Sequence, residues 1–424
     1  MRIPALLMCL LLSLPALAQN NPDDTIFGDT IVTDIENSDA NPAKTLLESD
    51  KVVIGGRFSV SAQVNLDPNA TKDGDVFSSG LIDLSTRLFL DARPSSDFRA
   101  FVKGDLSYKT STGVNFELRE VFADIDLYDT VFLRAGKQTI NWGVGFFFSP
   151  ANLINLERVN PEDPEAELAG PVAVKAQLPI GTDNLTGYLL MSDIESGIDI
   201  GLASRYEFLV EGYEVTVGGI YQPDNPWAVM ATGSGSIGDV AVFAEAVLQG
   251  NSNKVFVIKD PDSPSGVGTE TRKDAVFFSG TVGGRYNFTT EDQLFSVSAS
   301  AQYFFNGLGY DDNSVFTGNR AGIAELIGKG ELSINDLRER GKHNAAVSVS
   351  ANDIGGTDLT PSLFWLGNLS DGSGIVNASL QYRGIDFLTP RLSYRFNYGP
   401  EGAENSVNGI SHSLSVGFSF SGSF

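Results

Sequence analysis

Apolar and polar residues alternate with a period of two through much of this 424-residue chain, and most regularly at its end. In the final stretch SHSLSVGFSFSGSF, the side chains of Leu414, Val416, Phe418 and Phe420 alternate with serine or glycine. Such a period predicts a β-strand with one apolar and one polar face. The apolar face must cover either a protein core or lipid.

The first eighteen residues have the organisation of a secretory signal peptide. Arg2 precedes the apolar run LLMCLLLSLPALA, which ends in an A-x-A cleavage sequence at residues 16–18. This run is too short to span a bilayer. We therefore expect export and removal of residues 1–18, which leaves no cysteine because Cys9 is the only one.

Composition narrows the class of protein further. After the signal peptide, no segment has 18 consecutive apolar residues, so a membrane-spanning form would have to be a closed barrel. The chain has 53 acidic and 29 basic residues, which argues against nucleic-acid binding and suits a solvated surface or a cation-attracting pore.

The lengths of the connections distinguish a barrel from a soluble sandwich. About eighteen alternating segments can be counted, with sixteen as the alternative, and every long connection is odd-numbered while the even-numbered ones are short turns. This sorting is typical of an all-β, transmembrane antiparallel β-barrel with long extracellular loops and short periplasmic turns. The strands are expected to begin near residues 51, 80, 97, 114, 130, 171, 184, 197, 212, 226, 239, 274, 293, 342, 358, 373, 388 and 409.

With its signal peptide, sorted hairpins and terminal Phe424, the chain resembles the bacterial outer-membrane β-barrel superfamily. The resemblance implies a location in the outer membrane of a Gram-negative bacterium. It also implies that Phe418, Phe420 and Phe424 form the signal read by the barrel-assembly machinery.

A shorter resemblance concerns residues 133–155, LRAGKQTINWGVGFFFSPANLIN. They are similar to a strand-to-loop stretch of poorly characterised porin-like families, which have a G-[RK]-Q-x-x-x-W-G pattern followed by a proline and an asparagine. The matching residues are Gly136, Lys137, Gln138, Trp142, Gly143, Pro150 and Asn155.

The expected organisation is a signal peptide (1–18), an acidic periplasmic N-terminal segment (19–50) and a barrel (51–424). Segment 19–50 is either a floppy tail or a plug of the lumen. The long connection 306–341 carries helix-capping signals at Asn319 and at Ser333 with Asp336, and is expected to form a lid or an inner constriction.

Connection 140–170 is a second candidate for narrowing the lumen. Porins commonly fold the corresponding loop inward, and the alternative is an external flap. The constriction candidates are its charged residues Glu157, Arg158, Glu162, Asp163, Glu165 and Glu167.

Alternation also predicts which charged side chains point into the lumen, where selectivity would be set. The alternative is that these charges only neutralise one another across neighbouring strands. Between residues 114 and 127 the polar positions change from odd to even, which indicates a β-bulge or a wrong assignment. The pore-lining candidates are Arg87, Arg93, Arg99, Lys103, Asp105, Glu117, Arg119, Arg134, Lys175, Arg205, Arg391 and Arg395.

The function that this sequence favours is a porin-like outer-membrane channel for passive diffusion of small hydrophilic solutes or ions. Two alternatives are a gated transporter for apolar or oligomeric substrates, with Phe146, Phe147 and Phe148 as ligand contacts, and a non-conducting structural or adhesive barrel. With two histidines, no serine elbow and no metal-binding cluster, neither an enzyme nor a cofactor is expected. The expected partners are outer-membrane lipid, small solutes and the barrel-assembly machinery. Assembly into a homotrimer is an alternative to a monomer that the sequence leaves open.

Overall fold

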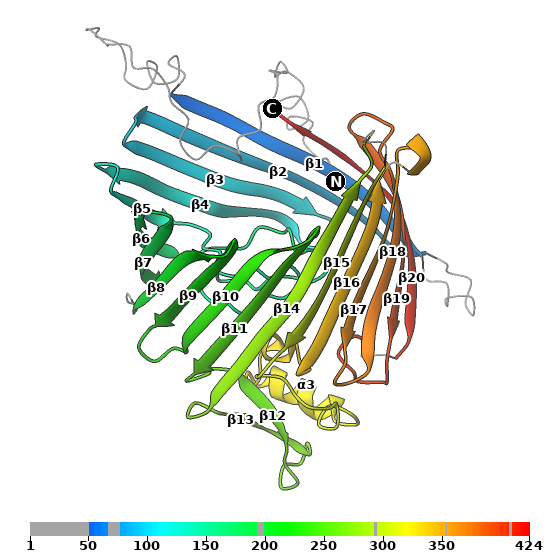
Figure 1. Cartoon of the computed structure of the whole chain (residues 1–424). Helices are drawn as coiled ribbons and strands as arrows, with labels where there is room; N and C mark the ends of the chain where they lie inside the picture. Colours follow the sequence, from blue (N-terminus) through cyan, green and yellow to red (C-terminus); the bar gives the residue numbers. More distant parts are fainter. Residues whose placement is uncertain (1–50, 67–76, 193–198, 292–294, 353, 407–408) are drawn as a thin grey trace.

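Eighteen antiparallel strands form one closed barrel in this computed structural model (Figure 1). The structure describes residues 51–66, 77–192, 199–291, 295–352, 354–406 and 409–424, so the predicted segments 1–18 and 19–50 lie outside it. The barrel strands are β1 (Val52–Leu66), β2 (Phe77–Ser95), β3 (Phe98–Lys109), β4 (Gly113–Leu127), β5 (Val131–Lys137), β6 (Val172–Ile180), β7 (Asp183–Ser192), β8 (Asp199–Val210), β9 (Tyr213–Tyr221), β10 (Trp227–Ile237), β11 (Val240–Gly250), β14 (Val276–Thr289), β15 (Ser296–Phe305), β16 (His343–Asn352), β17 (Leu359–Asn368), β18 (Ser373–Tyr382), β19 (Leu388–Tyr398) and β20 (Ser411–Ser423).

The barrel closes because its last strand pairs with its first. Each strand is antiparallel to the next, β11 pairs with β14, and β20 pairs with β1 along its length. Phe424 extends this ladder through two backbone hydrogen bonds to Gly56, each of 3.0 Å. The closure confirms eighteen strands rather than sixteen, and every predicted strand start lies within three residues of the observed one.

Every long connection is odd-numbered along the chain and every even-numbered one is short, and antiparallel pairing therefore puts all the long connections at one end of the barrel. Strands β8 and β9 are joined by Glu211 and Gly212 alone, both with positive φ, 50° and 88°. This is the type I′ geometry, whose twist matches that of the flanking strands. The predicted sorting of the loops is thus confirmed.

A β-bulge in β4 explains the change of polar positions between residues 114 and 127. Gly104 pairs with Leu118, whereas the adjacent Lys103 pairs with Glu120, so Arg119 is the extra residue. Arg119 reaches Asp105 at 2.9 Å and Glu120 reaches Lys103 at 2.6 Å. Both neighbouring residues therefore point into the barrel, which alternation alone could not predict.

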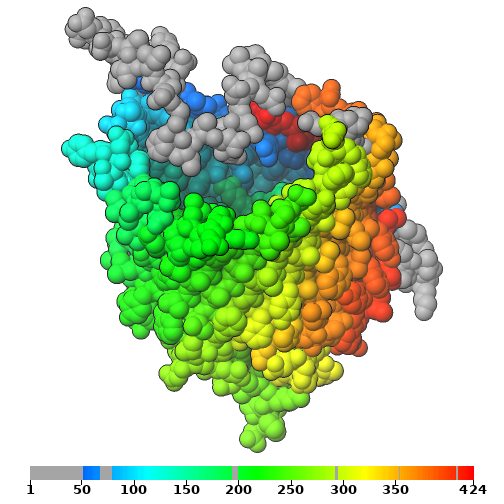
Figure 2. Space-filling model, viewed as in Figure 1, coloured from blue at the N-terminus to red at the C-terminus, as the bar shows by residue number. Residues whose placement is uncertain are grey.

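Alternate residues of the strands face the lumen and the outside. On β20, the residues that alternate with serine and glycine, Val416, Phe418 and Phe420, are 40–51% exposed and lie on the outer face. Charged side chains such as Arg87 and Asp105 lie on the inner face. Figure 2 shows the lumen as a hollow at the end of the barrel away from hairpin β12–β13. An apolar exterior around a polar interior is the arrangement that a barrel needs in lipid.

Two long connections pack together at the other end of the barrel (Figure 1). We call residues 251–275 and 306–342 the cap; it contains hairpin β12 (Val255–Lys259) and β13 (Val267–Thr271), helix α3 (Arg320–Gly328) and the 3₁₀ helix η3 (Ile334–Leu337). A further 3₁₀ turn, η4 (Ile354–Gly356), joins β16 to β17. In the described part of the chain, no helix combines the length and apolarity needed to cross a bilayer. The cap has a small apolar core of Val257, Val267, Val315, Phe316, Ile323, Leu326 and Leu332.

The helix signals read from the cap sequence are confirmed in part. Helix α3 forms where expected, but Asn319 does not cap it through its side chain, because its amide nitrogen donates to the Val315 carbonyl at 3.0 Å. The capping box of Ser333 and Asp336 is present, although it opens a 3₁₀ helix of only four residues. The cap lies at one end of the barrel, which is the position expected of a lid.

Cap stability is expected to rise with pH between about 8 and 10. Burial lowers the pKa of Lys254 from 10.5 to about 8, so over this interval the unfolded cap binds a proton that the folded cap does not. Burial raises the pKa of the neighbouring Tyr310, which therefore stays protonated. We expect a gain of about 2 kcal/mol, measured as hydrogen-exchange protection of Val255–Lys259 corrected for intrinsic rates. Lys254→Met should abolish the pH dependence, and equal protection of the wild type at pH 7.5 and 9.5 would contradict it.

Candidate functional site

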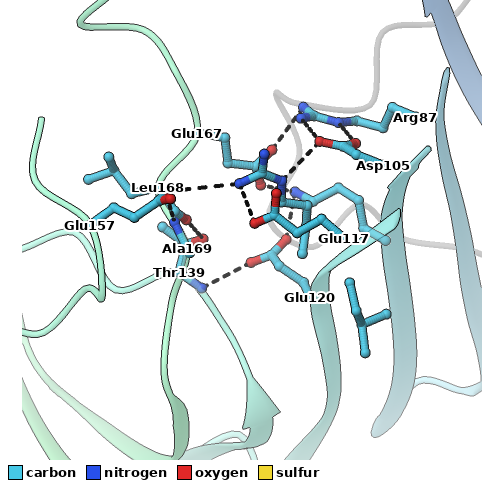
Figure 3. Close-up of polar contacts among 12 residues, drawn as sticks. Arg87, Asp105, Glu117, Glu120, Thr139, Glu157, Glu167, Leu168 and Ala169 are labelled. Atoms are coloured by element: carbon cyan, nitrogen blue, oxygen red, sulfur yellow. Dashed lines mark hydrogen bonds and ion pairs between the residues drawn. The ribbon is translucent and has the colours of Figure 1, made fainter. Parts of the chain in front are cut away.

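Residues 138–171, between β5 and β6, run across the interior of the barrel; we call them the inward loop. On one side, Glu167 pairs with Arg87 of β2 at 2.8 Å (Figure 3) and with Lys103 of β3. On the other side, the loop binds Glu245 of β11. Strands β2 and β11 are nine positions apart in the ring of eighteen, which puts them opposite each other. The loop therefore folds inward and is not an external flap.

Glu245 is the main anchor of the inward loop on the β11 side. Its carboxylate is 4% exposed and accepts hydrogen bonds from the backbone N–H groups of Val144 (2.6 Å), Gly145 (2.6 Å) and Ala151 (2.8 Å). The hydroxyl of Ser149 also donates to it, at 3.0 Å. One buried carboxylate thus satisfies four donors of a turn that has no strand partner of its own.

Gln302 of β15 holds the next part of the same turn. Its side-chain oxygen accepts from the Phe147 N–H at 2.7 Å, and its nitrogen donates to the Phe148 carbonyl at 2.5 Å. Neither Glu245 nor Gln302 stands out in the sequence, because each is a single polar residue in an alternating segment. One sequence feature could have identified Glu245: it is the only charged residue in the segment VAVFAEAVLQG.

Aromatic contacts hold the inward loop to β7 through Trp142 and to β15 through Phe148. Trp142, 2% exposed, packs with its ring centroid 5.8 Å from that of Tyr188, and Phe148 stacks on Phe304 at 5.2 Å. Phe147 and Phe148 are only 1% and 3% exposed. Of the three ligand contacts that the gated-transporter alternative assigns, Phe147 and Phe148 are thus packed as anchors. Phe146 is partly buried, with Arg285 Cζ 3.8 Å from its ring centroid.

The GKQxxxWG stretch builds the start of the inward loop. Gly136 has φ +135°, and a Cβ there would lie 2.1 Å from the Val121 carbonyl oxygen. The Gln138 side chain is 1% exposed and donates to the Ala173 carbonyl at 3.1 Å. Asn155 accepts from the Ile140 N–H at 2.9 Å. Gly136, Gln138 and Asn155 of this pattern thus stabilise the turn by which the chain leaves β5 and enters the lumen.

The charged side chains on β2–β5 and β8 that alternation assigns to the lumen are mostly paired with each other. The alternative, neutralisation between neighbouring strands, therefore describes most of this wall. The pairs are Arg87–Asp105 (2.7 Å), Arg93–Asp91 (3.2 Å), Arg99–Asp91 (2.9 Å), Lys103–Glu120 (2.6 Å), Arg119–Asp105 (2.9 Å), Arg119–Glu117 (2.9 Å), Arg134–Asp124 (2.6 Å) and Arg205–Glu207 (3.1 Å). Among the described residues, Lys175 and Arg391 have no ion-pair partner.

Four of the six constriction candidates connect the inward loop to its surroundings. Glu167 binds β2 and β3, and the carboxylate of Glu157 lies 4.0 Å from Arg119. Glu162 pairs with Arg395 of β19, and Arg158 pairs with Glu339 of the cap at 3.0 Å. Asp163 and Glu165 make no ion pair within the part of the chain that the structure describes.

The resulting site is a lumen narrowed by a fixed loop with charged groups on both sides. A narrow, charged passage discriminates between solutes by size and by charge. Over the described ranges, no three or more His, Cys, Asp or Glu side chains are grouped as a metal site would require.

Glu167 offers a test of the charge balance at this passage. Glu167→Gln removes the carboxylate between Arg87 and Lys103, which keep only their strand partners Asp105 and Glu120. The passage becomes more positive by one charge, so we expect ion selectivity to shift toward anions. The measurement is the reversal potential in a salt gradient. Glu165→Gln, with the same charge change at a position without an ion pair, should produce a smaller shift; equal shifts would show that Glu167 has no special position.

No protein-family model matches the chain, and no curated protein matches it. Similar solved structures include the outer membrane protein opdK of Pseudomonas aeruginosa, at 10% identity over 88% of this chain and 99% of that one, with a TM-score of 0.49. OccK3 (OpdO) of the same organism has 10% identity over 91% and 100%, with a TM-score of 0.49. OccAB1 of Acinetobacter baumannii has 11% identity over 88% and 97%, with a TM-score of 0.47. At these identities and scores, what those proteins do does not transfer to this chain.

Proposed function

We propose that this protein is an outer-membrane, porin-like channel through which small hydrophilic solutes or ions diffuse passively. The observation that carries the proposal is the inward loop, which is pinned at Glu245 and Gln302 and crosses a lumen lined with charges. A loop fixed in this way narrows a water-filled path without closing the barrel wall. A purely structural barrel would have no need of it.

The closed barrel and its apolar exterior support a position in a membrane. Export through a cleaved signal peptide at 1–18 leads to the outer membrane of a Gram-negative bacterium. Phe418, Phe420 and Phe424 serve as the assembly signal, and outer-membrane lipid covers the outer face. The protein has no catalytic activity of its own.

Single-channel conductance in a planar bilayer tests the proposal. Refolded, heat-modifiable protein should give steady conductance steps without an applied energy source, and a salt gradient should give its ion selectivity. Correctly folded protein that conducts no ions would overturn the proposal in favour of a structural or adhesive barrel.

A further inference from the structure

Several buried polar atoms on the inner faces of β7 and β8 have no hydrogen-bond partner among the described residues. Thr186, 1% exposed, lies directly opposite Arg205, and neither the Thr186 hydroxyl nor the Arg205 Nε–H is bonded. The indole N–H of Trp142 in the inward loop likewise makes no hydrogen bond of ordinary geometry, although the Tyr188 hydroxyl is near it. Buried groups of this kind are rarely left unpaired, so an additional partner is expected.

The same place carries one positive charge without a counter-charge. Lys175 of β6 lies opposite Tyr188 on one side and opposite Arg134 on the other. Arg134 and Arg205 are neutralised by Asp124 and Glu207, whereas Lys175 has no ion pair among the described residues. The cluster therefore has a net charge of one positive unit.

The inward loop contacts this cluster at two points. Arg205 donates from Nη1 to the Asn141 carbonyl at 2.9 Å, and Trp142 packs on Tyr188. The free groups of Lys175, Arg205, Trp142 and Thr186 can all donate: an ammonium, a guanidinium N–H, an indole N–H and a hydroxyl. Asn184 Oδ1, near the start of β7, is an unpaired acceptor on the same strand. A water molecule could accept from only about two of these donors, whereas an anion could accept from all of them.

We propose that Lys175, Thr186, Arg205 and Trp142 bind a resident small monovalent anion of the chloride type beneath the inward loop. One negative charge balances the excess of the cluster, and each free donor gains an acceptor. The site lies behind the loop, so the anion stabilises the loop against β6–β8 and is not a solute in transit. The inference does not rest on the proposed function, because binding can be measured without conduction.

Bromide, which has the charge of chloride and an anomalous X-ray signal, tests the site. In crystals of the protein grown in sodium bromide, we expect an anomalous peak in contact with Lys175 Nζ and Thr186 Oγ1. Lys175→Met should lose the peak. Arg391→Met, which removes another unpaired luminal cation from β19, should keep it.

Thr186→Val provides a second variant, because it removes the hydroxyl without changing the charge or the shape. It should weaken bromide binding by about tenfold in a titration followed by thermal unfolding. An ordered water without anomalous signal in the wild-type crystals would overturn the inference. So would a bromide peak that persists unchanged in Lys175→Met, or Thr186→Val binding as tight as wild type.

Discussion

Glu245→Gln is expected to release the inward loop from the β11 wall and to increase the single-channel conductance. In the wild type, the carboxylate accepts from three backbone N–H groups and from the Ser149 hydroxyl. Glutamine replaces one carboxylate oxygen with an amide nitrogen. This nitrogen is a donor, so it cannot accept a hydrogen bond from the N–H groups of the loop. We expect a loss of about 3 kcal/mol from the attachment of the loop, and the open lumen should conduct more.

Glu214→Gln is the matched control for this experiment. Glu214 is exposed near the start of β9, and the same substitution there removes the same charge without touching the inward loop. Its conductance should stay near that of the wild type. If Glu245→Gln conducts like Glu214→Gln while both are fully folded, the loop is not held by Glu245.

Gly136→Ala is expected to impair folding of the whole barrel. The φ angle of +135° is one that residues with a side chain rarely adopt, and the new Cβ would lie 2.1 Å from the Val121 carbonyl oxygen. The contact is with the backbone of β4, so the pairing of β4 with β5 would have to shift. We expect about 3 kcal/mol of destabilisation, visible as a lower refolded fraction on heat-modifiability gels and a lower midpoint of thermal unfolding.

Gly187→Ala tests whether this effect comes from the close approach rather than from glycine in a strand. Gly187 lies in β7, and a Cβ there would meet no atom within 4 Å. This variant should fold as well as the wild type. Similar losses in both variants would show that the contact with β4 is not what requires glycine at 136.

The sequence predicted the barrel well because each strand carries its own signal. Alternation in segments such as 98–108, together with the order of long and short connections, requires no knowledge of distant contacts. Even the β-bulge at Arg119 could be suspected, since it moves the polar residues from odd to even positions.

Attachment of the inward loop could not be predicted in this way. Glu245 binds Val144 across 101 positions of sequence, and Gln302 binds Phe147 across 155. A period of two assigns a residue to a face but not to a partner across the lumen. Alternation could likewise assign the charged residues of β2–β5 to the inner face. It could not predict which of them pair, so their mutual neutralisation stayed one of two alternatives.

The inward loop is fastened differently along its two edges. Buried hydrogen bonds and aromatic packing hold it at β11 and β15, whereas ion pairs of partly exposed side chains hold it at β2, β3 and β19. Dissolved salt competes with ion pairs of partly exposed side chains more than with buried hydrogen bonds, so it weakens the second kind of contact more than the first. A rise in salt concentration is therefore expected to weaken the contacts of the loop with β2, β3 and β19 before those with β11 and β15.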